Sequence, residues 1–121
     1  MKTIIIIPAR WESTRLPGKP LAMIGDKPMI QHTWERARES NADEVIIACD
    51  SKIVYDAATK FGAQVIWTHD AETGTERVIE VQEIKNADFI INVQGDEPFI
   101  NPKDINEVIK IVHSHPDKVA T

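Results

Sequence analysis

Cysteine is nearly absent from this chain of 121 residues, in which Cys49 is the only one. A single cysteine cannot form a disulfide within the chain, and this favours a reducing setting. No apolar run approaches the length that crosses a membrane, and the first residues lack the charged, apolar and cleavage regions of a signal peptide. We therefore expect a cytoplasmic protein with no membrane partner.

An excess of positive charge is also missing, because 19 acidic residues outnumber 14 basic ones and leave a formal net charge of −5. Binding to nucleic acid or to a membrane surface needs an extended basic surface. The charge balance argues against both partners and favours a small anionic ligand. With 42% hydrophobic residues and no internal change of composition, the chain fits one globular domain.

Short apolar runs alternate with amphipathic segments along the chain. The apolar runs predict buried strands over residues 3–7, 44–49, 64–67 and 88–93. Helical spacing of apolar residues predicts helices over residues 28–40, 53–61, 74–85 and 102–112. Such repeated strand and helix units indicate an α/β fold with a mostly parallel sheet and right-handed crossovers.

A cationic segment follows the first predicted strand. Pro8 lacks the N–H group that a sheet ladder uses, so we expect the strand to stop there. Arg10, Arg15 and Lys19 then place three fixed positive charges within ten residues. Because ligands of open α/β sheets bind at the carboxyl ends of the strands, this segment predicts an anion site.

Familiar phosphate-binding patterns do not describe this segment. A P-loop needs glycine, four further residues and then Gly-Lys-Ser/Thr, whereas here Ser13 takes the first position and Pro20 follows Lys19. The dinucleotide fingerprint is missing too, because Gly18 is the only glycine of the segment. The cations repel one another unless a polyphosphate or carboxylates neutralise them. A solvated basic loop with Glu12 as its internal partner is the alternative.

Two other segments supply further candidate residues. Residues 94–98 follow the fourth predicted strand, where Asp96 can offer carboxylate oxygen to a divalent cation and Gly95 permits close backbone approach. Residues 73–77 open a predicted helix, whose free N–H groups and Arg77 can bind a base or ribose. An exposed acidic turn and a capping box with Arg77 in solvent are the alternatives.

In their order along the chain, these segments resemble the N-terminal half of the 3-deoxy-manno-octulosonate (Kdo) cytidylyltransferases, or CMP-Kdo synthetases. The matching segments are residues 7–10, 13–21, 25–32, 35–37, 73–77 and 92–98. The pattern Arg-x-x-Ser/Thr-x-Arg-Leu-Pro-Gly-Lys also occurs in acylneuraminate cytidylyltransferases. Gly-Thr-Glu-Arg and Val-Gln-Gly-Asp-Glu-Pro favour the Kdo branch.

The resemblance implies a nucleotidyltransferase fold with a Rossmann-like sheet, and transfer of CMP from CTP to Kdo with release of pyrophosphate, for lipopolysaccharide or capsule synthesis. It implies that Lys19, Arg10 and Arg15 are the catalytic cations and that Asp96 binds Mg²⁺ as the cofactor. The residues that it implies around the nucleotide are Pro8, Ala9, Ser13, Gly74, Thr75, Arg77 and Gln94.

The resemblance also implies a longer protein that forms a homodimer. Residues 1–121 are then expected to be the nucleotide-binding half of a cytidylyltransferase domain, with the C-terminal half absent. That other half carries much of the sugar pocket and a second carboxylate for the metal. An enzyme for acylneuraminate or another sugar, and a CTP-binding fragment without catalysis, are the alternatives.

Overall fold

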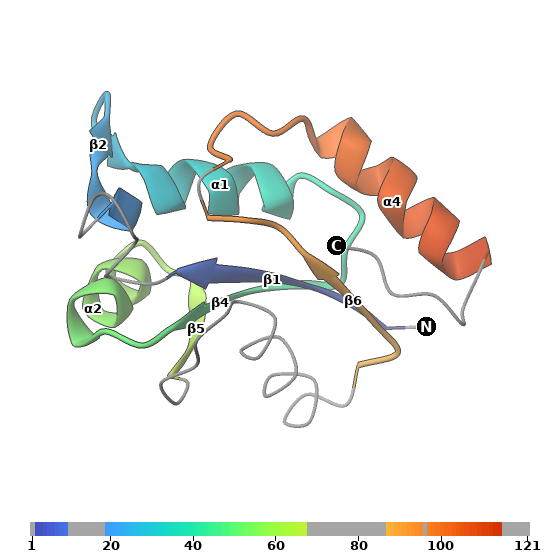
Figure 1. Ribbon diagram of the computed structural model, residues 1–121, viewed down its shortest axis with the longest axis horizontal. Helices are drawn as coiled ribbons and strands as arrows, with labels where there is room; N and C mark the ends of the chain where they lie inside the picture. Colours follow the sequence, from blue (N-terminus) through green and yellow to red (C-terminus); the bar gives the residue numbers. More distant parts are fainter. Residues whose placement is uncertain (1, 10–18, 68–86, 96, 115–121) are drawn as a thin grey trace.

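The computed structural model describes residues 2–9, 19–67, 87–95 and 97–114. Of Lys19 it describes only the backbone. Its centre is a four-stranded parallel sheet in the order β5-β4-β1-β6 (Figure 1). The strands are β1 Thr3–Ala9, β4 Glu44–Cys49, β5 Gln64–Trp67 and β6 Phe89–Asn92. The α/β fold predicted from the sequence is confirmed, and β4 and β5 have the predicted bounds.

Strand β1 lies inside the sheet and is buried along its whole length. It pairs with β4 from Ile4 to Ala9 and with β6 from Thr3 to Ile6. Its four successive isoleucines are fully buried, because alternate side chains of a strand enter the two faces of a sheet and both faces are covered here. An all-apolar run is therefore what this position requires.

Pro8 lies inside β1, so the expectation that the strand stops at this residue is wrong. The Val93 N–H donates to the Ile6 carbonyl oxygen at 3.0 Å, so Ile6 directs its backbone polar groups toward β6. Pro8, two residues later, faces the same side. Because the pairing with β6 ends at Ile6, no ladder hydrogen bond needs an N–H from Pro8, and β1 continues beside β4 to Ala9.

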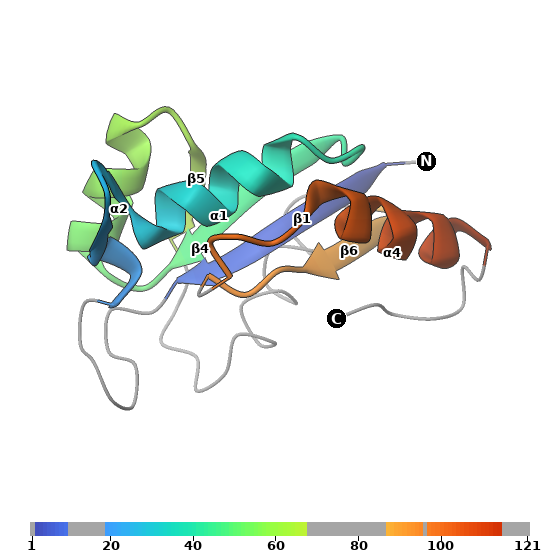
Figure 2. The ribbon, with the colours of Figure 1, turned by 90° about the horizontal axis from the view of Figure 1, so that it is seen from above.

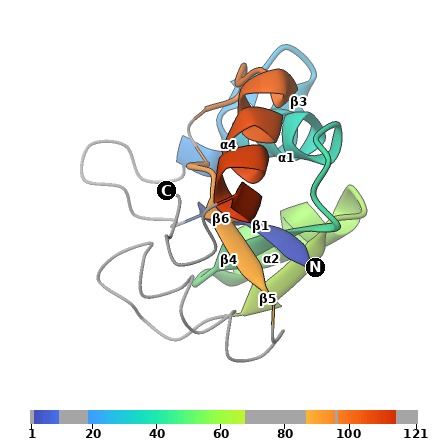
Figure 3. The same cartoon turned by 90° about the vertical axis from the view of Figure 1, so that its right-hand side faces the viewer.

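Three of the helices pack on one face of the sheet (Figure 2). They are α1 Met29–Arg38, α2 Lys52–Lys60 and α4 Pro102–Ser114. Helices α1 and α4 lie side by side, and α4 contacts β6 (Figure 3). The helix expected over residues 74–85 lies outside the described residues. None of the helices in the described ranges is both long enough and apolar enough to cross a membrane.

Local sequence signals account for the helix ends. The Asn101 side-chain oxygen accepts a hydrogen bond from the Lys103 N–H at 2.9 Å, as expected where Asn101-Pro102 opens a helix. Gly62 follows α2 with a φ of 93°, the left-handed conformation predicted for it. Ala22 accepts a hydrogen bond from the Met29 N–H at 2.8 Å, which joins the first turn of α1 to the preceding hairpin.

That hairpin consists of β2 Met23–Ile24 and β3 Lys27–Pro28 and follows a short 3-10 helix, η1 Lys19–Leu21. An ion pair joins it to α1, because the Lys27 ammonium donates to the two carboxylate oxygens of Glu35 at 3.1 and 3.2 Å. Partial burial acts to raise the pKa of Glu35. The hydrogen bonds from Lys27 and Gln31 outweigh this effect and lower the pKa of the carboxyl below its ordinary value.

We predict that Glu35→Gln destabilises the fold at neutral pH and not in acid. Because the pKa of Glu35 is lowered on folding, its carboxylate stabilises the fold above the unfolded-state pKa of about 4.3, and this contribution disappears as the pH falls through the lowered value. Urea unfolding at pH 7 should show a loss of at most about 1 kcal/mol, since the two side chains are 39% and 38% exposed. An equal loss at pH 3 would contradict the prediction.

Candidate functional site

The candidate site lies at the carboxyl ends of β1 and β6, where the order of the strands reverses. From β1 the chain moves to β4 and β5 on one side, and β6 returns on the other side of β1. Ligands of open α/β sheets bind outside the strand ends at this point of the topology. The cationic segment, which contains Arg10, Arg15 and Lys19, begins directly after β1, and residues 94–98 begin shortly after β6. The two predicted segments therefore start from adjacent strands.

Gly95 brings the chain after β6 into contact with the end of β1. It is buried, and a Cβ atom at this position would lie 2.9 Å from the Pro8 carbonyl oxygen and 3.2 Å from Ile30 Cδ1. Distances below 3.0 Å from a Cβ to backbone are not tolerated without a shift, so only glycine fits. The chain after β6 therefore approaches the backbone of β1 closely at Gly95, and the approach to a ligand expected for this residue stays a prediction.

Helix α1 contacts the same turn through Thr33. The Thr33 hydroxyl is buried and donates to the Gly95 carbonyl oxygen at 3.0 Å, with the Met29 carbonyl oxygen further away at 3.3 Å. The turn is closed on its other side by the Glu97 N–H, which donates to the Gln94 carbonyl oxygen at 3.3 Å. Backbone and helix contacts together fix the position of residues 94 and 95.

The structure describes some of the predicted site residues. Pro8 and Ala9 are the last two residues of β1 and are buried, whereas Gln94 is exposed after β6. Lys19 begins η1. The predicted residues outside the described ranges are Arg10, Ser13, Arg15, Gly74, Thr75, Arg77 and Asp96. The roles assigned to all of these residues remain predictions.

No cluster of three or more His, Cys, Asp or Glu side chains with the arrangement of a metal site occurs within residues 2–9, 19–67, 87–95 and 97–114. Asp96, the predicted metal ligand, falls between two of these ranges. Within the described residues, the candidate site therefore consists of buried strand ends and a fixed turn. The cationic segment and Asp96 follow these in the sequence.

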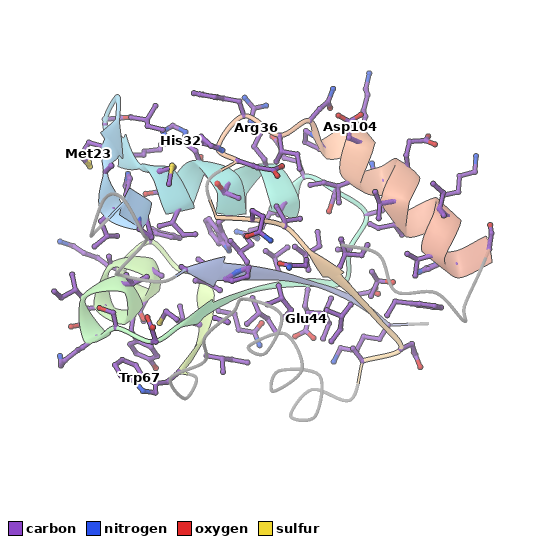
Figure 4. All side chains as sticks on the ribbon, viewed as in Figure 1. Met23, His32, Arg36, Glu44, Trp67 and Asp104 are labelled. Carbon is purple, nitrogen blue, oxygen red and sulfur yellow. The ribbon has the colours of Figure 1, made fainter. Side chains whose placement is uncertain are left out.

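A groove of about 370 Å³ lies elsewhere, at the amino ends of β4 and β5. The residues that line it are Trp34, Arg38, Ala42, Asp43, Glu44, Val45, Gly62 and Gln64. In Figure 4 Glu44 marks this end of the sheet and Trp67 the other, where β5 ends. The groove is thus not part of the site at the carboxyl ends of the strands.

Thr33 is the residue of this site that the sequence pattern does not single out. Its partner, Gly95, lies 62 residues away along the chain, and no local rule pairs them. A signal is nevertheless present, because Thr33 lies on the apolar stripe of α1 with Ile30, Trp34 and Ala37. A polar residue on a buried helical stripe needs a hydrogen-bond partner, and here that partner belongs to the site.

We predict that Gly95→Ala lowers the stability of the chain by about 1–3 kcal/mol, because the added Cβ overlaps the Pro8 carbonyl oxygen and forces one of the strand ends to move. Urea unfolding measures the loss, and the backbone amide signal of Ala9 in NMR spectra should shift.

Gly25→Ala is the matched control. Nothing lies within 4 Å of a Cβ at Gly25, so only its φ of 66° opposes the change, at about 1–2 kcal/mol. The Ala9 signal should stay in place in this control. An unshifted Ala9 signal in Gly95→Ala would show that the two strand ends do not contact each other.

Comparison with known proteins places this fold among relatives of similar sequence. A profile of the cytidylyltransferase family matches residues 4–121. A 3-deoxy-manno-octulosonate cytidylyltransferase 2 from Actinobacillus pleuropneumoniae is 48% identical in an alignment of length 125, which covers 100% of this chain and 50% of the relative. The corresponding protein of Pseudoalteromonas translucida is 43% identical, with 100% and 49% covered. The chain thus spans about half the length of the curated relatives it matches.

Solved structures agree with these matches. A CMP:2-keto-3-deoxy-manno-octonic acid synthetase solved with CTP superimposes with a TM-score of 0.93 at 46% identity, over 96% of this chain and 49% of that one. A cytidylyltransferase from Leptospira borgpetersenii superimposes with a TM-score of 0.84 at 28% identity, over 95% and 50% of the two chains.

Proposed function

The chain belongs to the cytidylyltransferase family, and from this premise we propose that residues 1–121 are the nucleotide-binding half of an enzyme that transfers CMP from CTP to Kdo. The products are CMP-Kdo, for lipopolysaccharide or capsule synthesis, and pyrophosphate. The observation that carries the proposal is the 46% identity, with a TM-score of 0.93, to a Kdo-activating synthetase solved with CTP. The reaction is proposed to take place in the cytoplasm, in a protein that forms a homodimer.

The proposed catalytic cations act on the phosphates of CTP. A hydroxyl of the sugar attacks the α-phosphorus in line, and the bond from this phosphorus to the pyrophosphate oxygen breaks. Negative charge develops on the phosphoryl oxygens and on the leaving pyrophosphate. Arg10, Arg15 and Lys19 belong to the segment that begins where β1 ends, and their fixed positive charges neutralise it. Lys19 is the proposed contact to the α-phosphate and the leaving group.

Mg²⁺ is the proposed cofactor, and Asp96 is its proposed ligand from this chain. The donor set fits, because Mg²⁺ prefers carboxylate oxygen and usually completes its shell with water and substrate phosphates. The fit is supported by the preceding residue, since Gly95 is fixed against Pro8 at the end of β1. When bound, the ion supplies positive charge at the phosphates of CTP.

The nucleotide is proposed to lie along the strand ends. The backbone of Pro8 and Ala9 is proposed to contact the nucleotide at the end of β1. The exposed side-chain amide of Gln94 offers both a donor and an acceptor to the base or ribose. The other residues proposed to contact it are Ser13, Gly74, Thr75 and Arg77. These contacts give the groups of this chain one task, which is to bind and orient CTP.

We predict that Lys19→Ala weakens CTP binding by about tenfold or more, because a hydrogen bond to a charged group contributes about 1.5–3 kcal/mol. Calorimetry of the 121-residue chain with CTP and Mg²⁺ measures the change. Lys110→Ala is the matched control, since it removes the same charge from the exposed surface of α4 and should leave binding unchanged.

Pyrophosphate release by the whole enzyme, measured with CTP, Mg²⁺ and Kdo, tests the proposed reaction. Saturable CTP binding without release would identify the chain as a nucleotide-binding module, and release with acylneuraminate in place of Kdo would replace the proposed sugar. CTP binding that Lys19→Ala and Lys110→Ala leave equally strong would contradict the role of the cationic segment.

A further inference from the structure

We propose that Thr33 is a positioning residue for the metal-dependent part of CTP binding. The inference rests on the proposed function, and it extends that function to a residue in the middle of α1. Thr33 acts through the carbonyl group of Gly95, which it fixes by a hydrogen bond. Gly95 in turn is the residue from which the chain continues to the proposed metal ligand, Asp96.

The hydrogen bond of Thr33 favours the turn over the helix. Its side chain is 0% exposed, and its hydroxyl oxygen is 3.0 Å from the Gly95 carbonyl oxygen and 3.3 Å from that of Met29. A threonine within a helix commonly donates to the carbonyl four residues earlier. Here the shorter of the two contacts is the one to Gly95, outside the helix. It gives the buried Gly95 carbonyl the hydrogen-bond partner that a buried backbone group requires.

Gly95 is fixed from two sides. On one side the Pro8 carbonyl oxygen leaves no room for a Cβ, and on the other Ile30 and Thr33, neighbours on one face of α1, both approach it. Because a peptide group is planar, fixing the Gly95 carbonyl restricts the direction in which the chain leaves this residue. The position of α1 is itself fixed, since Trp34 and Ala37 are buried in the core.

A threonine with this task orients a ligand without touching it. Groups that hold metal ligands in place typically change metal affinity by about 10–100-fold when they are replaced. The proposal therefore separates two quantities. Removal of the Thr33 hydroxyl should weaken the gain in CTP affinity that Mg²⁺ provides, and it should leave the affinity measured without metal nearly unchanged.

Thr33→Val tests this, because valine keeps the shape of threonine and lacks the hydroxyl. Calorimetry of the chain with CTP, once with Mg²⁺ and once with EDTA, gives the ratio of the two affinities. We expect Thr33→Val to reduce this ratio by about tenfold. Thr33→Ser, which retains the hydroxyl, should restore most of it.

Thr3→Val is the matched control. Thr3 is also buried, at 1% exposure, and its hydroxyl lies 2.7 Å from His113 Nε2. It occupies the amino end of β1, at the opposite end of the sheet from Gly95. Loss of this hydroxyl should lower the melting temperature much as Thr33→Val does, without changing the ratio of affinities.

The outcomes separate this inference from the proposed function. A parent chain that binds no CTP would contradict the proposed function together with the role of Thr33. A parent chain whose affinity rises with Mg²⁺ and whose ratio is the same in Thr33→Val would overturn the role of Thr33 alone. Equal losses of the ratio in Thr33→Val and Thr3→Val would reduce the effect to general destabilisation and overturn it as well.

Discussion

The contact between Gly95 and the Pro8 carbonyl group is the constraint on which the rest of the site depends. It sets the distance between the carboxyl ends of β1 and β6, because the residue at position 95 cannot carry a side chain. The buried isoleucines of β1 hold one partner in place, and α1 holds the other through Ile30 and Thr33. A rigid core thus determines where two segments rich in charge begin.

This arrangement divides the work between strands and loops. The parallel sheet places the carboxyl ends of its strands on one side of the domain, where ligands of open α/β folds usually bind. The proposed chemistry then needs fixed positive charge for the phosphates and a carboxylate for the metal, and both come from segments that follow these strand ends. Similarity to a synthetase solved with CTP, with a TM-score of 0.93, supports the proposal that this chain binds CTP.

Much of this account follows from the sequence, and the exceptions have physical causes. Strands β4 and β5 are predicted with their bounds because each is an apolar run between polar residues. The family resemblance, which rests on motifs that follow one another along the chain, is confirmed by the match of the cytidylyltransferase family to residues 4–121 and by a curated relative that is 48% identical. The end of β1 is not predicted, because Pro8 is tolerated only where pairing with β6 has already ended. Thr33 is missed because its partner is distant in sequence and fixed by tertiary packing.

Locating bound CTP on the chain tests whether the carboxyl ends of β1 and β6 form the nucleotide site. Titration of the isotope-labelled chain with CTP and Mg²⁺, followed through its backbone amide signals by NMR, locates the site residue by residue. We expect the signals of Ala9, Gln94 and Gly95 to shift most, because these residues lie at the adjoining carboxyl ends of β1 and β6. Shifts concentrated instead at Gly62 and Gln64, in the groove at the opposite end of the sheet, would contradict it.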